Sequence, residues 1–426
     1  MHLKLLIKNG HVIDPGNKID EVMDILVEGE KISKIGFGLD AKAETVIDAA
    51  GKIVMPGIVD MHVHLREPGR EDKETVFSGT KAAAKGGVTS VLAMPNTLPS
   101  LDSAGVIKTL SDIIKKTANV GVFICGAITM ERAGKKLTDI AALKKQGVIA
   151  ISDDGNSIDS DELMRQAIKE AKKEKVLVIC HSEDKSLSGK GLVNRGFTST
   201  RLGLRGISRE SEYKRVARDI KLAEEIGAEV HIAHVSCSES VDIIRKAKKK
   251  GLKVTAETAP HYFGLNEEDL LGYNTSMKVN PPLRAKDDVL AIREGLKDGT
   301  IDVIASDHAP HTENEKEIEF EHAEFGSIGL ETELAVSVTE LIGNGLLTWS
   351  ELVKKISLNP ARILDINKGV LGFGKDADIT IVSPDKEWVV DKVGFVSKSK
   401  NSAFIGKKLK GVVEYTIYKG KVIYKA

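Results

Sequence analysis

The sequence predicts an α/β protein in which a (β/α)8 barrel, or TIM barrel, is joined to a small β-sandwich domain built from both chain ends. Eight apolar runs alternate with charged, helix-like segments in the middle of the chain. Short alternating strands with turns occupy the beginning of the chain and return towards its end. At 426 residues, the chain is also longer than one hydrophobic core usually grows.

Residues 1–55 are predicted to form the N-terminal part of the β-sandwich domain. Apolar and polar residues alternate over short stretches, and Asn9-Gly10 and Glu28-Gly29 are typical turn pairs. The expected strands cover residues 3–8, 11–14, 24–27, 31–35 and 45–48.

Residues 56–365 are predicted to form the barrel. Eight β-α repeats in about 300 residues are typical of a closed (β/α)8 barrel. The apolar runs, which we expect to be its strands, cover residues 57–64, 88–94, 121–127, 148–152, 176–181, 228–235, 253–258 and 301–306. The intervening segments with apolar residues at helical spacing include 161–173, 211–226, 238–249 and 287–296.

Residues 366–426 are predicted to complete the β-sandwich domain. Strand-like alternation returns here, and Lys419-Gly420 is expected to be the turn of the last hairpin. The expected strands cover residues 379–383, 388–390, 411–418 and 421–424.

Composition excludes several kinds of partner. Lys+Arg and Asp+Glu are equal at 62 each, so no net charge attracts nucleic acid or an anionic membrane. No stretch approaches the roughly 20 apolar residues of a membrane span, and the first residues lack the apolar core of a signal peptide. The three cysteines have no paired spacing, which indicates a reducing compartment. We therefore expect a cytoplasmic protein.

Metal-binding residue types gather at the predicted C-terminal ends of the barrel strands, where barrel enzymes place their chemistry. His62 and His64 are one residue apart, so on a strand they project to the same side. Each such feature alone also suits an ordinary polar strand end or turn. The other candidates at strand ends are Asn96, Asp153, Asp154, His181, His234 and Asp307, followed by His308 and His311.

Together these residues indicate a metal centre with nitrogen and oxygen ligands and no thiolate. Two divalent ions bridged by one carboxylate are plausible for a hydrolytic site of this composition, and zinc is the first choice.

At the level of motifs, the chain resembles the class I dihydroorotases of the amidohydrolase superfamily over essentially its whole length. The stretches that carry the resemblance are Asp60–Gly69, Met94–Thr97, Ser152–Gly155, Cys180–Glu183, His231–Ser236, Lys278–Arg284, Ser306–His311 and Gly329–Thr332.

The resemblance implies a ligand set for two zinc ions. His62, His64 and Asp307 would hold one ion, His181 and His234 would hold the other, and Asp154 would bridge them. Many relatives use a carboxylated lysine as the bridge, but residues 148–155 contain no lysine. Asp153 competes for this role, and we favour Asp154 because the bridging residue of the family immediately precedes the glycine.

The implied activity is the reversible closure of N-carbamoyl-L-aspartate to L-dihydroorotate, with loss of water, in pyrimidine biosynthesis. Asp307 would be the catalytic acid and base. Arg66, Asn96 and His311 would bind the free carboxylate. Residues that would also contact the substrate are His64, Leu65, Asn280, Phe325 and Gly326. The polar segment 312–325 is expected to act as a lid over bound substrate.

Two alternatives remain open at this stage. One is a related cyclic amidase, a hydantoinase or an allantoinase, although Arg66, Asn96 and Asp154 favour dihydroorotase. The other is a non-catalytic relative that serves as a scaffold for aspartate transcarbamoylase, although the six ligand positions are all kept. An active enzyme that associates with aspartate transcarbamoylase is also compatible with the sequence, and we expect a homo-oligomer.

Overall fold

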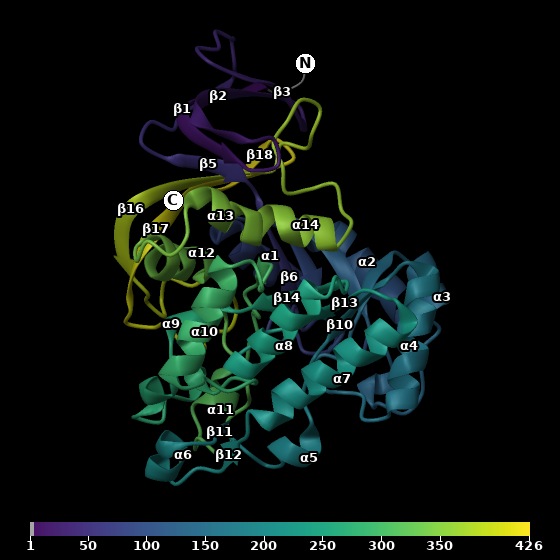
Figure 1. Cartoon of the computed structure of the whole chain (residues 1–426). Helices are drawn as coiled ribbons and strands as arrows, with labels where there is room; N and C mark the ends of the chain where they lie inside the picture. Colours follow the sequence, from purple (N-terminus) through teal and green to yellow (C-terminus); the bar gives the residue numbers. More distant parts are fainter. Residues whose placement is uncertain (1–3) are drawn as a thin grey trace.

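The computed structural model describes residues 4–426 and shows a barrel with a separate β domain at one end (Figure 1). The predicted fold class is confirmed. From residue 4 the chain runs through the β domain, passes through the barrel and returns to the β domain, so both ends of the described chain lie in that part of the molecule. The boundaries at residues 55/56 and 365/366 stay predictions.

Eight parallel strands form the barrel, and each lies inside one of the eight predicted runs. The barrel is closed just after its last strand, by an isolated parallel bridge between His308 and Val63 of the first strand. There the amide of His64 donates to the carbonyl of His308 at 2.9 Å. The strands are β6 (Ile58–Val63), β7 (Val88–Ala93), β8 (Gly121–Gly126), β9 (Val148–Ile151), β10 (Leu177–Cys180), β13 (Val230–Ile232), β14 (Val254–Thr258) and β15 (Val303–Ile304).

Helices surround this sheet, and the four helical segments named from the sequence are confirmed. In α4, Ser160 accepts a hydrogen bond from the amide of Leu163 and caps the helix, while Met164 and Ile168 face the core. The outer helices are α1 (Val76–Lys85), α2 (Ala104–Thr117), α3 (Ile140–Lys145), α4 (Asp161–Glu174), α7 (Glu210–Ile226), α8 (Ser238–Lys249), α10 (Lys286–Lys297), α12 (Glu333–Ser337), α13 (Trp349–Val353) and α14 (Asn359–Ile363).

Shorter elements interrupt the barrel between its strands and helices. Most of them gather at the end of the molecule opposite β1–β3 (Figure 1). They are α5 (Lys185–Ser188), β11 (Val193–Asn194), α6 (Phe197–Leu202), β12 (Gly206–Ile207), α9 (Pro260–Gly264) and α11 (Glu313–Lys316).

The terminal strands form one mixed sheet in the order β18-β17-β16-β5-β1-β2-β3, with β4 paired to β1. This sheet has its own core, which includes Ile7, Ile25, Ile379 and Ile417. The strands are β1 (Lys4–Asp14), β2 (Ile19–Glu28), β3 (Lys31–Gly36), β4 (Thr45–Asp48), β5 (Ile53–Pro56), β16 (Ile379–Val389), β17 (Lys408–Tyr418) and β18 (Lys421–Lys425).

Several strands of the β domain differ from the sequence prediction: β2 begins at Ile19 rather than at residue 24, β17 begins at Lys408 rather than at residue 411, and β5 was not expected. The expected turn at Asn9-Gly10 is a bulge inside β1, because Asn9 has a φ of 60° and the pairing with β2 shifts there. A Cβ at Gly10 would lie 2.4 Å from a methyl group of Val54, so glycine allows the strand to continue. The runs 379–383 and 388–390 likewise join in β16. Residue 3, the expected start of the first strand, lies outside the described residues.

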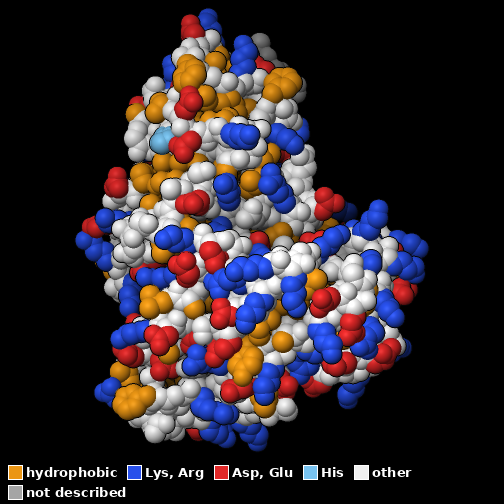
Figure 2. All heavy atoms as spheres, in the orientation of Figure 1, with side chains coloured by type: hydrophobic (Ala, Val, Ile, Leu, Met, Phe, Trp, Pro, Cys, Tyr) orange, Lys and Arg blue, Asp and Glu red, His pale blue; other side chains and the backbone are white. Residues whose placement is uncertain are grey.

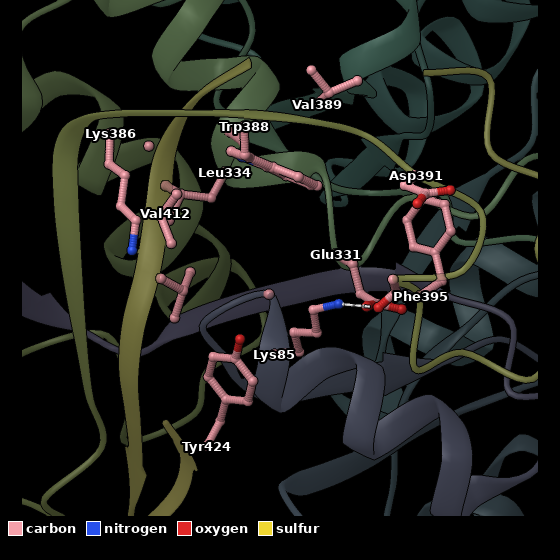
Figure 3. A pocket seen from close by; sticks show the side chains of 15 residues that line it. Lys85, Glu331, Leu334, Lys386, Trp388, Val389, Asp391, Phe395, Val412 and Tyr424 are labelled. Atoms are coloured by element: carbon pink, nitrogen blue, oxygen red, sulfur yellow. Dashed lines mark hydrogen bonds and ion pairs between the residues drawn. The ribbon is translucent and has the colours of Figure 1, made fainter. Parts of the chain in front are cut away.

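The junction between the barrel and the β domain contains a cavity of about 270 Å³ that is lined in part by Trp388 and Tyr424 (Figure 3). Lys85, at the end of α1, forms an ion pair of 3.0 Å with Glu331 in this region. Glu331 also accepts a hydrogen bond from the amide of Ser397 at 2.9 Å. These contacts attach the chain after β16 to the barrel.

The visible surface carries Lys or Arg side chains interspersed with Asp or Glu side chains (Figure 2). This mixture agrees with the balanced charge of the sequence. Among residues 4–426, every helix is too short or too polar to cross a membrane.

Candidate active site

The six predicted metal ligands meet at the C-terminal ends of five barrel strands, around the carboxylate of Asp154. Its Oδ1 lies 3.3 Å from Nε2 of His62, 3.4 Å from Nδ1 of His181 and 3.4 Å from Nε2 of His234. Its Oδ2 lies 3.4 Å from Nε2 of His64. Asp154 therefore lies at the centre of the four histidines.

The cluster satisfies the geometric requirements of a metal site. Two groups of three ligand atoms, each within 4.8 Å of one another, share Asp154; they are His62, His64 and Asp154, and Asp154, His181 and His234. Nε2 of His62 and Oδ1 of Asp154 are buried and have no hydrogen-bond partner among residues 4–426. A cation would satisfy both atoms, so these residues fit a metal ion.

Asp153 is turned away from this cluster. One of its oxygens accepts hydrogen bonds from the amides of Ile128 and Thr129, each at 2.9 Å, and the other accepts from the Thr129 hydroxyl. The backbone of Asp154 is held separately, since its carbonyl accepts from Nη1 of Arg132 at 2.6 Å. Of the two aspartates, only Asp154 is available to bridge.

Asp307 completes the cluster from the loop after β15. Its Oδ1 lies 3.3 Å from Nε2 of His64 and 3.7 Å from Nε2 of His62. Asp307 has a φ of 47°, and Arg66 and His234 have φ values of 62° and 35°. Positive φ is costly for such residues and is concentrated at functional sites, where surrounding contacts maintain it. Neighbouring His308 points away and lies 3.3 Å from Glu74.

Electrostatics in the cluster favour bound cations. Burial opposes ionisation of Asp154, but the charge of His62 and the nearby imidazoles of His181 and His234 hold its pKa well below the usual range. Burial also opposes a charge on His181, yet Asp154 and Glu183 raise its pKa to about 9. Because protons and metal ions compete for the same imidazole nitrogens, a metal ion can supply the positive charge that these carboxylates attract.

Two carboxylates that the sequence analysis gave no role orient the histidine ligands. Nδ1 of His62 lies 2.5 Å from Glu257, and Nε2 of His181 lies 3.4 Å from Glu183. Each contact engages the ring nitrogen that does not face Asp154 and so fixes the tautomer. Glu183 also accepts from Asn280 at 3.2 Å. Glu183 lies in the same motif as His181, whereas Glu257 lies in β14, to which no site residue had been assigned.

Arg66, Asn96 and His311 form the other end of the site. The buried guanidinium of Arg66 donates through Nε to the carbonyl of Pro310 at 3.1 Å, and its Nη2 lies 3.3 Å from Nε2 of His311. Oδ1 of Asn96 lies 2.7 Å from Nδ1 of His64 and accepts a hydrogen bond from it. The amide NH2 of Asn96 is therefore left as a donor. Burial lowers the pKa of Arg66 to about 10, so it is still charged at neutral pH.

One cavity of about 490 Å³ connects the two ends. Its lining includes His64, Arg66, Asn96, Asp154, His181, His234, Asn280, Asp307, His311, Phe325 and Gly326. His62 lies fully buried beneath it. Leu65 differs from the prediction, because its side chain is buried in the barrel core and reaches towards Gly79 in α1. A substrate contact from Leu65 would therefore have to come from its backbone.

Gly326 permits the close packing around His311. Its φ is 140°, and a Cβ at this position would lie 3.0 Å from Nε2 of His311 and 2.8 Å from Cβ of Ala309. The adjacent carbonyl of Phe325 accepts from Nε2 of His311 at 2.8 Å. A larger residue at 326 would have to displace the imidazole.

The segment 312–325 is more firmly packed than its polar sequence indicates. Phe320 and Ala323 are buried, and Nζ of Lys278 donates to their carbonyls at 2.8 and 2.6 Å. Nζ of Lys316 donates to the carbonyl of Glu324 at 2.6 Å. The segment therefore contributes buried residues despite its polar sequence, and closure over substrate stays a prediction.

Asn401 is a further site-supporting residue that the sequence analysis missed. Its Oδ1 accepts from the amide of His311 at 3.1 Å, and its Nδ2 donates to the carbonyls of Ala309 and Gly326 at 3.2 and 3.1 Å. Asn401 lies between β16 and β17, within the range assigned to the β domain, and no motif marks it. Only the folded chain brings it to the barrel.

Comparisons with known proteins decide the family. Residues 51–240 match a family model described as dihydro-orotase-like. A dihydroorotase from Elusimicrobium minutum is 53% identical over 420 residues, which cover 99% of this chain and 97% of that protein. The chain belongs to the dihydroorotase family. A second family member, from Geobacter metallireducens, is 51% identical and covers 99% of this chain and 100% of its own length.

The barrel is shared more widely than the dihydroorotase family. The solved structure of an L-hydantoinase (dihydropyrimidinase) from Arthrobacter aurescens superposes with a TM-score of 0.90, at 25% identity, and covers 100% of this chain and 96% of that chain. The sequence identity to the dihydroorotase from Elusimicrobium minutum is about twice the identity to this hydantoinase. The resemblance stated from the motifs is confirmed, and the His and Asp cluster is consistent with a metal cofactor.

Proposed function

We propose that this protein is a dihydroorotase, which catalyses the reversible cyclisation of N-carbamoyl-L-aspartate to L-dihydroorotate and water in pyrimidine biosynthesis. The observation that carries the proposal is 53% identity to a dihydroorotase across 99% of the chain. The cavity supports it, because a metal-ligand cluster lies at one end and carboxylate-binding donors at the other. In a cyclic amide that bears a carboxylate, the amide group suits the metal-ligand cluster and the carboxylate suits the donors at the other end.

The cofactor that the ligand set supports best is a pair of zinc ions. His62, His64 and Asp307 would hold one ion, and His181 and His234 the other, with Asp154 between them. Imidazole and carboxylate ligands without a thiolate are compatible with zinc. When bound, such ions lower the pKa of water and polarise a carbonyl group.

Asp307 is the residue best placed to move protons. In ring hydrolysis, its Oδ1 would accept a proton from the attacking water and deliver it to the departing ring nitrogen. In the opposite direction, it would remove a proton from the carbamoyl amine. Burial opposes ionisation of Asp307, but contact with His64 and nearby imidazole charge keep its pKa below the ordinary value, so its carboxylate is ionised at neutral pH and free to accept a proton.

The free carboxylate of the substrate would bind at the opposite end. Arg66 supplies a charged fork, His311 supplies a ring N–H, and Asn96 supplies its amide NH2. Asn280, Phe325 and Gly326 form the neighbouring wall of the cavity. These donors favour dihydroorotate over cyclic amides that carry no carboxylate.

The test measures the rate of dihydroorotate hydrolysis from the change in ultraviolet absorbance, with protein of known metal content. Hydantoin and allantoin are assayed in parallel. We expect dihydroorotate to be the preferred substrate and Asp307→Asn to lower kcat by at least about 100-fold. Preferred turnover of hydantoin or allantoin would replace the proposal with a related cyclic amidase. A zinc-loaded protein without turnover of any of them would support the scaffold alternative.

A homo-oligomer, association with aspartate transcarbamoylase and a cytoplasmic location stay predictions. Light scattering of the protein alone, and after mixing with aspartate transcarbamoylase, tests the first two.

A further inference from the structure

Lys73 is a buried cation at the carboxylate end of the cavity, in the loop that follows β6. Its side chain is 7% exposed. Nζ lies 3.1 Å from Nδ1 of His311 and 2.9 Å from a carboxylate oxygen of Glu315. The carbonyl of Lys73 accepts a hydrogen bond from the hydroxyl of Ser399 at 2.6 Å. Contacts at both its backbone carbonyl and its ammonium group therefore fix the position of Lys73.

The neighbours of His311 select one tautomer of its ring. The carbonyl of Phe325, 2.8 Å from Nε2, can only accept, so Nε2 carries a hydrogen. The ammonium of Lys73 can only donate, so Nδ1 carries the lone pair. Both contacts require the same neutral ring. The Phe325 carbonyl engages this hydrogen, and Nη2 of Arg66, 3.3 Å from Nε2, can only donate, so it gains no bond from the ring and is left to bind an anion beside it.

We propose that Lys73 is a positioning residue for substrate: by donating to Nδ1 of His311, it keeps the ring hydrogen on Nε2, where the Phe325 carbonyl and the substrate carboxylate can share it. This inference rests on the proposed dihydroorotase function. Without Lys73, only the Phe325 carbonyl favours the hydrogen on Nε2, while the Glu315 carboxylate, 3.5 Å from Nδ1, favours it on Nδ1. A ring with its hydrogen on Nδ1 would turn a lone pair towards the substrate carboxylate.

The charges around His311 agree with a neutral ring that depends on a fixed tautomer. Burial, followed by the charges of Arg66, Lys73 and Lys316, holds the pKa of His311 well below its ordinary value. Glu315 is the facing carboxylate, 3.5 Å from Nδ1, and it also pairs with Lys73. A neutral imidazole has only one N–H, so its position decides whether His311 attracts or repels an anion.

Steady-state kinetics on dihydroorotate provide the first test. We expect Lys73→Met to raise KM about tenfold, through loss of one charge-assisted hydrogen bond, while kcat changes less than about threefold. Lys73→Arg keeps a donor and should restore most of the affinity. Arg70→Met is the matched control, because Arg70 pairs with the same carboxylate of Glu315 at 2.8 Å but contacts Asp72 rather than His311. Its KM should stay within about twofold.

The tautomer is measured directly by 15N NMR of histidine-labelled protein, with the His311 signal assigned from a His311→Gln spectrum. The unsubstituted protein should show the hydrogen on Nε2, and Lys73→Met should shift the signal towards Nδ1–H. An unchanged KM, an unchanged tautomer in Lys73→Met, or an equal KM increase in Arg70→Met would each overturn the inference. Absence of dihydroorotate turnover in unsubstituted protein would instead reject the proposed function, because the NMR result does not require activity.

Discussion

The two ends of the cavity are built from different parts of the fold. At the metal end, His62, Asp154, His181 and His234 lie at or directly after strand termini. At the carboxylate end, the donors lie on loops, and their supports come from segments far apart in the sequence, such as Asn401. The first end is therefore fixed by the sheet, and the second by individual side-chain contacts.

This difference has a functional consequence. Strand termini are held by the hydrogen-bonded ladder, so a substitution there changes the chemistry of the cluster without moving its neighbours. Loop residues depend on each other, so a substitution there alters how substrate is held. We expect changes at the metal end to affect metal content and kcat, and changes at the carboxylate end to affect substrate binding with metal retained.

The largest effect is expected for Asp154→Asn, which keeps the shape of the central residue and removes its charge. Loss of the shared carboxylate should release at least half of the bound metal and lower kcat by about 1000-fold or more. Metal analysis and the dihydroorotate assay measure both quantities. Normal metal content together with a near-normal kcat would show that Asp154 is not the bridge.

Arg66→Lys tests the carboxylate end with the charge preserved. A lysine cannot reproduce the two parallel hydrogen bonds of a guanidinium, so kcat/KM for dihydroorotate should fall about 100-fold, or about 3 kcal/mol. Metal content should stay at the level of the unsubstituted protein. Loss of metal in this variant would mean that the two ends are not independent.

Glu257→Gln changes the residue that contacts the ring nitrogen of His62 on the side away from Asp154. Burial opposes ionisation of Glu257, but His62 and His231 hold its pKa below the ordinary value, so it is a carboxylate at neutral pH. Its replacement should lower metal affinity by about 10- to 100-fold, because His62 loses the partner that fixes its tautomer. Competition with a chromogenic chelator measures the affinity. An unaltered affinity would show that the contact is not needed to orient His62.

Glu315→Gln should have the smallest effect and a defined pH dependence. Burial opposes ionisation of Glu315, but Arg70 and Lys73 lower its pKa to about 2. Its stabilising contribution is therefore present above the ordinary pKa of 4.5 and is lost as the pH falls through about 2. We expect a difference in the free energy of unfolding of about 1 kcal/mol at pH 7, after screening by solvent.

Urea unfolding of both proteins at pH 7 and pH 3 tests this prediction, and the difference should shrink to less than half at pH 3. A difference that does not change with pH would mean that Glu315 acts through packing rather than through its charge.

The sequence predicted the metal end better than the carboxylate end. Hydrophobic runs located every barrel strand, and the position of His62, His181 and His234 at the ends of those runs placed them at one mouth. The motifs also named Arg66 and His311, but no periodicity showed that Lys73 would contact His311. Leu65, between His64 and Arg66, was also expected to contact the substrate, whereas alternation along the chain turns its side chain into the core.

By itself, the sequence determined the order of elements, the barrel and the residue types available at its mouth, because these follow from local hydrophobic periodicity and from motifs along the chain. Only the tertiary structure turned Asp153 away from the histidines and Asp154 towards them, brought Glu257 behind His62, and placed Lys73 and Asn401 around His311. These choices depend on hydrogen bonds between residues distant in sequence, whose directions are set once the barrel closes and the loops pack on it.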